Sequence, residues 1–120
     1  MVSSKDSIYK FEYSERIKAE VSIAHQLFEQ LIGLKEDEFS GGKKIMEAYI
    51  NAILTDIKIA RNVLGSKVIF SKTSRKLTES IGRIDLREYE EARKCFAEAL
   101  TEITTYCAES FESLRKMGLM

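Results

Sequence analysis

Apolar residues recur at steps of three and four positions in four stretches of the chain. The two clearest stretches are formed by Met46, Ile50, Ile53, Ile57, Ala60 and Leu64, and by Tyr89, Ala92, Phe96, Ala99, Ile103 and Tyr106. This spacing places the apolar side chains along one side of an α-helix, and such a stripe is stable only when it packs against another. No proline interrupts the stretches. The pattern predicts an all-α fold, a four-helix antiparallel up-down-up-down bundle.

Glycines and capping residues predict where the four helices end. The expected helices span about residues 7–34, 43–64, 66–82 and 85–116. Gly65 is expected to close the second helix in a left-handed conformation, and Ser66 to cap the third after a turn of two or three residues. A turn this short makes the two helices antiparallel neighbours.

Two further boundaries follow from the same signals. The acidic and glycine-containing segment 36–42 predicts a loop, with Ser40 as the N-cap of the second helix. Asp85 and Glu88 form an acidic version of a capping box, which predicts that the fourth helix begins at Asp85.

The second helix carries a second apolar row beside the first. Its members are Ile45, Tyr49, Ala52, Ile59 and Val63. A helix that is apolar over so much of its circumference is expected to be the most buried of the four. Asp56 interrupts this row, and we expect it to form a salt bridge, at the boundary of the core or facing another subunit, with a partner from another helix.

The two halves of the chain are weakly similar to each other. Residues 54–57 (LTDI) resemble residues 100–103 (LTEI), and 32–33 (IG) resemble 81–82 (IG). The length predicts one domain over 1–120, and four antiparallel helices make it a bundle of two helical hairpins. Chance similarity between amphipathic helices is the preferred explanation of the resemblance, and two copies of one helical hairpin are the alternative.

The composition is that of a globular protein with no net charge. Of the 120 residues, 44% are hydrophobic and 32% charged, and 19 basic residues balance 19 acidic ones. A nucleic-acid coat protein or a membrane-surface protein usually carries a basic excess. The first six residues do not have the apolar character of a signal peptide, and no apolar run reaches the ~20 residues of a membrane span. Zero charge also removes the repulsion that keeps small proteins apart, which favours self-association.

The two cysteines predict a reducing environment. Cys95 and Cys107 lie twelve residues apart in one predicted helix, about 18 Å along its axis, which is too far for a disulfide. Two unpaired thiols suggest a cytoplasmic protein.

No pattern of catalytic, metal-binding or cofactor-binding residues is present, so we expect neither enzymatic activity nor a cofactor. His25 is the only histidine, and Glu29 shares its helix face. A carboxylate metal site in a helical bundle needs more ligands than this pair, so a structural role is favoured for His25. The segment 41–44 (GGKK) resembles a crude anion site, but a flexible turn is the preferred interpretation.

One segment has an uneven charge distribution. Residues 66–83 include five basic residues and a single acidic one, Glu79. The candidate contacts for a nucleic-acid backbone are Lys72, Arg75, Lys76 and Arg83. The alternative is a solvated helix face whose charges are balanced by nearby acidic residues such as Glu88.

Aromatic residues near both ends of the chain suggest a contact with another subunit. The helices are expected to differ in length, so the ends of the longer ones should project and expose apolar area. The candidate interface residues are Tyr9, Phe11, Tyr13 and Phe111. The sequence therefore favours a non-catalytic interaction module, either a homodimer or one subunit of a larger complex, with nucleic-acid binding as the alternative.

Overall fold

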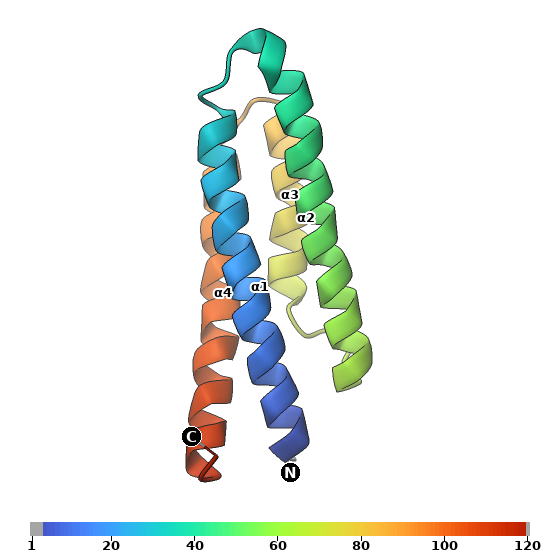
Figure 1. Cartoon of the computed structure of the whole chain (residues 1–120), viewed down its shortest axis with the longest axis vertical. Helices are drawn as coiled ribbons and strands as arrows, with labels where there is room; N and C mark the ends of the chain where they lie inside the picture. The colour runs from blue at the N-terminus through green and yellow to red at the C-terminus, as the bar shows by residue number, and fades with distance from the viewer. Residues whose placement is uncertain (1–3, 120) are drawn as a thin grey trace.

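The structure, a computed structural model, describes residues 4–119, which form four helices (Figure 1). Their bounds are Ser4–Leu31 (α1), Glu36–Leu64 (α2), Ser71–Asp85 (α3) and Tyr89–Lys116 (α4). The predicted all-α, four-helix antiparallel bundle is confirmed. No helix in the described part of the chain has an apolar stretch that would reach across a bilayer.

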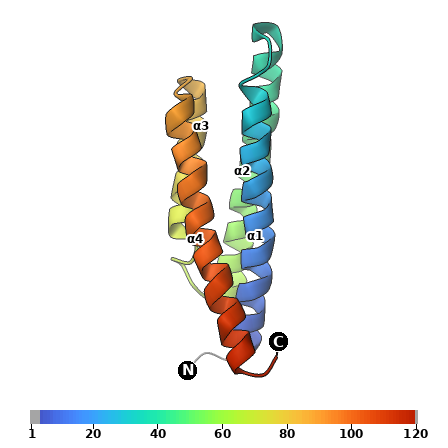
Figure 2. The ribbon, with the colours of Figure 1, turned by 90° about the vertical axis from the view of Figure 1, so that its left-hand side faces the viewer.

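The helices pack in chain order around the bundle. α4 lies against α1 and α3, and α2 lies against α1 and, less extensively, α3. The bundle measures 53 × 22 × 18 Å. Since α3 has 15 residues and the other helices have 28 or 29, α3 extends along only part of the length of the bundle. Figure 2 shows the C-terminal half of α4 leaning on α1, beyond the reach of α3.

The core consists mainly of the predicted stripes of α1, α2 and α4, with Leu77 and Ile84 of α3 and Phe70 of the α2–α3 connection. The fully buried positions include Ile17, Val21, Ala24 and Phe28 of α1, Ile50, Ile53 and Ile57 of α2, and Phe96, Ala99 and Ile103 of α4. Burial of this apolar surface is the main stabilising contribution to such a bundle.

α3 buries small hydroxyl residues as well as apolar ones. Thr73 and Ser80 are fully buried beside Leu77, whereas Ser74 is half-buried. The Thr73 hydroxyl lies 2.7 Å from Glu102 Oε1 and 3.2 Å from the Ala99 carbonyl oxygen. The buried side of α3 is thus partly polar. α4 provides the acceptors for the Thr73 hydroxyl, whereas the Ser80 hydroxyl donates to the Leu77 carbonyl oxygen of α3 itself.

The predicted loop at residues 36–42 is wrong, because α2 begins at Glu36. Its acidic residues occupy the first turn of the helix, where negative charge interacts favourably with the helix dipole. Ser40 therefore lies inside α2 and is not its N-cap. A Cβ atom at Gly42 would approach Leu34 Cδ1 to 2.8 Å, so glycine allows close packing here between α2 and the segment after α1.

Gly41 and Gly65 should respond in opposite directions to replacement by alanine. Gly41 is helical and a Cβ atom there meets nothing within 4 Å, so Gly41→Ala is expected to raise the free energy of unfolding by about 0.5–1 kcal/mol. Gly65 ends α2 with φ 65°, so Gly65→Ala is expected to lower it by about 1 kcal/mol. Urea unfolding measures the effects of both substitutions. Destabilisation by Gly41→Ala would indicate that residues 36–42 form a loop after all.

The predicted start of α3 is also wrong. Residues 66–70 form the connection, and α3 begins at Ser71 after Phe70, which is fully buried with φ 60°. The Ser66 hydroxyl accepts hydrogen bonds from the backbone N–H groups of Val68 and Ile69, so it organises the connection. Burial of the Phe70 ring fixes the chain here and delays the helix.

The start of the last helix differs from the prediction as well. α3 continues through Gly82 to Asp85, and α4 begins at Tyr89 after Glu88, which makes no capping hydrogen bond through its side chain. Asp85 instead lies 3.0 Å from Lys43 of α2. This cross-bundle ion pair replaces the predicted capping box.

Candidate functional site

The second apolar row of α2 faces outward. Ile45 is 70% exposed, Ile59 45% and Val63 44%, so the expectation that α2 is the most buried helix is wrong. Residues 4–119 contain no further helix that covers this row. We call these residues, with Tyr49 and Ala52, the outer row.

α1 continues the same surface on the other side of a groove. The groove is lined by Arg16, Ala19 and Glu20 of α1 and by Tyr49, Ala52, Thr55 and Asp56 of α2. One and two turns further along α1 lie Ile23, 45% exposed, and Leu27, 38% exposed. We call the outer row together with Ala19, Ile23 and Leu27 the outer α1–α2 face.

A charged cluster lies at the middle of this face. Arg16 of α1 donates to Asp56 of α2 at 3.3 Å and to Glu20 at 3.3 Å. The predicted salt bridge between Asp56 and another helix is confirmed. Arg16 remains largely exposed while both carboxylates are mostly covered, so the two acids share one accessible cation.

This arrangement raises the pKa of Glu20 from 4.5 to about 7, first because of burial and then because Asp56 is adjacent. Arg16 opposes the shift but does not cancel it. The same two carboxylates, after burial, raise the pKa of Tyr49. Glu20 therefore gains or loses its proton near pH 7.

The stability of the protein should depend on pH through Glu20. Its pKa is higher in the folded state than in the unfolded state, so the contribution is fully present below pH 4.5 and is lost as the pH rises through about 7. Glu20→Gln is expected to raise the free energy of unfolding by about 1–2 kcal/mol at pH 8 and to change it little at pH 4. Urea unfolding at both pH values measures this, and equal effects would contradict it.

The four predicted basic residues of α3 differ in whether they form ion pairs. Lys76 lies 3.0 Å from Glu98, and Arg83 lies 2.9 Å from Glu88, so the predicted balance by Glu88 is confirmed. Lys72 lines a depression that also contains Glu102 and Glu109. Arg75 is exposed and takes part in no ion pair of residues 4–119.

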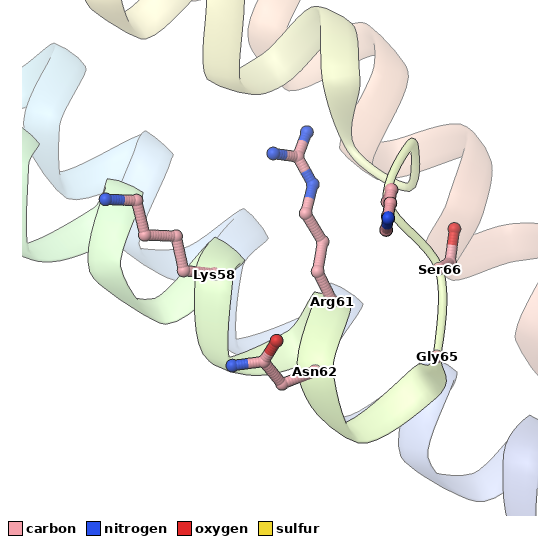
Figure 3. Close-up of a pocket in the computed structure, with 6 residues that line it drawn as sticks. Lys58, Arg61, Asn62, Gly65 and Ser66 are labelled. Atoms are coloured by element: carbon pink, nitrogen blue, oxygen red, sulfur yellow. The ribbon is translucent and has the colours of Figure 1, made fainter.

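A different set of cations gathers at the connection between α2 and α3 (Figure 3). A depression of about 510 Å³ is lined by Lys58, Arg61, Asn62, Gly65, Ser66 and Lys67. No acidic residue lines it. We call this the α2–α3 depression.

His25 lies at the edge of the core, as predicted. Its ring stacks on Phe96 at 5.7 Å, and Nε2 lies 3.4 Å from Glu29. Arg93 donates to both oxygens of Glu29 and thereby lowers its pKa. Within residues 4–119, no group of three histidine, cysteine or acidic side chains is placed to hold a metal ion.

The aromatic residues predicted as an interface lie at the projecting end of α1 and α4. Phe11 packs against Phe111 at 6.1 Å, and Tyr13 packs against the core. Tyr9 is half-buried beneath Lys5. These residues partly cover one another, and their role in a subunit contact stays a prediction.

Both cysteines are free and buried. Burial, followed by the nearby carboxylates Glu79 and Glu15, raises the pKa of each thiol to about 11. Neither thiol is activated as a nucleophile near neutral pH.

The sequence analysis overlooked Arg16 and the α2–α3 depression. Arg16 lies four residues before Glu20, which was a usable signal for a local ion pair, but its contact with Asp56 depends on the register of α1 against α2. Lys58 and Arg61 lie in α2 and Lys67 lies in the connection that follows it, so no run of basic residues marked them.

No known protein family, curated protein or solved structure matches the chain.

Proposed function

We propose that the protein is a non-catalytic interaction module that associates with a second copy of itself through the outer α1–α2 face. The observation that carries the proposal is the exposure of Ile45, Ile59 and Val63 on one side of α2, at 70%, 45% and 44%. Scattered apolar residues are normal on a surface, but exposed apolar residues that gather on one face mark an interaction site.

The dimensions of this face suit a dimer. The outer row spans 19 residues from Ile45 to Val63, which is about 27 Å of helix, and two helices are about 20 Å wide. The projected area of about 540 Å² approaches the ~800 Å² that each partner buries in an ordinary interface.

Two further features favour a second copy as the occupant. The alanines at positions 19 and 52 line the groove, and small residues there allow another helix to approach closely. The chain has no net charge, so copies do not repel each other at long range. The free, buried thiols agree with a cytoplasmic location, which we also propose.

Sedimentation equilibrium of matched variants tests the proposal. The wild type is expected to dimerise at micromolar concentration, and Ile45→Lys with Ile59→Lys to remain monomeric, because the charges would be desolvated in the interface. The control, Val68→Lys with Leu86→Lys, changes two residues that are 73% and 70% exposed outside this face. A monomeric wild type, or equal loss of association in both variants, would overturn the proposal.

The alternative function, binding of a nucleic-acid backbone through residues 66–83, is supported by the exposed cations Lys72 and Arg75. Retention on heparin at low salt that is lost in Lys72→Glu with Arg75→Glu would favour it. The ion pairs of Lys76 and Arg83 reduce the charge available for such contacts.

A further inference from the structure

The α2–α3 depression combines three cations that have no anionic partner in the part of the chain that the structure describes. Lys58 and Arg61 come from the last two turns of α2, and Lys67 from the connection. Within residues 4–119, no carboxylate lies within ion-pair distance of any of the three, whereas most other arginines form such pairs. The paired arginines are Arg16, Arg83, Arg87, Arg93 and Arg115.

Arg61 is held in place by neutral groups. Its Nε donates to the Ile69 carbonyl oxygen at 3.0 Å, and a terminal nitrogen lies 3.5 Å from the Ser71 hydroxyl. These contacts orient the guanidinium without neutralising its charge. Figure 3 shows the guanidinium extending from α2 beside the connection, with Lys58 on the neighbouring turn.

The geometry points to a site for a phosphate group. We propose that the α2–α3 depression binds a ligand through phosphate oxygens held by Arg61, Lys58 and Lys67. A guanidinium with free N–H groups and two mobile ammonium groups are the donors that phosphate recognition uses. An exposed pair of single charges contributes little, so a group with two negative charges that meets three cations is favoured over a lone carboxylate.

Polar groups of the connection complete the site. The Ser66 hydroxyl oxygen already accepts two backbone hydrogen bonds, so its hydrogen remains available to donate to a phosphate oxygen. Asn62 lines the same depression and offers an amide. The site is separate from the outer α1–α2 face and does not depend on the proposed dimer.

Calorimetric titration at 50 mM salt tests the site with two probes, inorganic pyrophosphate and a twelve-residue oligothymidylate. The variant is Lys58→Gln with Lys67→Gln, since both side chains are exposed and leave Arg61 and the connection intact. The control, Lys44→Gln with Lys116→Gln, removes the same charge at two exposed positions outside the depression. We expect the dissociation constant to rise at least tenfold in the variant and to change less than twofold in the control.

The two probes distinguish the source of the phosphate. If pyrophosphate binds at least as tightly as the oligonucleotide, the ligand is a small phosphorylated molecule. Binding of the oligonucleotide at least a hundredfold more tightly, with a salt dependence that falls by about 1.4 in logarithmic slope in the variant, indicates a nucleic-acid backbone. The proposal is overturned when neither probe binds the wild type, or when variant and control bind equally.

Discussion

Replacing Ile53 with alanine is expected to lower the free energy of unfolding by about 2–5 kcal/mol. Ile53 is fully buried on the inner side of α2, so the substitution removes apolar contacts and leaves a cavity that the neighbouring helices fill only in part. Urea unfolding at low protein concentration, which minimises any self-association, measures the loss.

The matched control is Ile45→Ala, eight residues earlier on the same helix. Ile45 is 70% exposed, so the change is expected to stay within about 0.5 kcal/mol in the monomer. Both substitutions exchange the same side chains and carry the same helix propensity term. Equal costs at the two positions would mean that both rows of α2 are buried.

Replacing Glu102 with alanine is expected to cost about 2–3 kcal/mol. Glu102 belongs to α4 but accepts hydrogen bonds from the backbone N–H groups of Lys72 and Thr73, at 3.1 and 2.7 Å, in the first turn of α3. It therefore replaces the N-cap side chain that α3 lacks, and it also serves the buried Thr73 hydroxyl. Loss of a cap costs about 1 kcal/mol, and a buried N–H such as that of Thr73 left without an acceptor costs about 1–3 kcal/mol. The Thr73 hydroxyl keeps the Ala99 carbonyl oxygen as an acceptor.

Glu109 provides the comparison for this cap. It lies two turns further along α4, is exposed, and lines the same depression as Glu102. Glu109→Ala removes the same charge from the same helix and is expected to cost less than about 0.5 kcal/mol. Thermal unfolding of both variants measures the difference, and similar values would show that Glu102 acts only through its charge.

The inner stripes of α1, α2 and α4 were predictable because each keeps a strict helical period. The choice between the two rows of α2 was not predictable in the same way. The row that contains Ile45 and Ile59 has the same spacing of three and four residues as the row that contains Ile50 and Ile53. Periodicity alone therefore cannot decide which of the two rows the other helices cover. That choice depends on the rotation of α2 against its neighbours, which the packing of α1 and α3 determines.

The helix ends were predicted less well, because local signals were overridden by contacts between helices. Gly41 and Gly42 indicated a loop, yet α2 includes both, and Gly42 allows close packing with the segment after α1. Asp85 indicated an N-cap, yet it pairs with Lys43 across the bundle. The candidate sites share this property, since Arg16 with Asp56 and Lys58 with Lys67 meet only after folding.

The central claim is that the outer α1–α2 face is open in one copy and covered in the dimer. Methyl relaxation of the isoleucines by a soluble paramagnetic gadolinium chelate, measured at low and high protein concentration, tests it directly. Ile23, Ile45 and Ile59 should relax strongly in dilute solution and become protected at high concentration, while Ile53 stays protected throughout and Ile8, 38% exposed at the far end of α1, stays accessible. Unchanged relaxation of the three outer isoleucines, or protection of Ile8 in their place, would contradict the account.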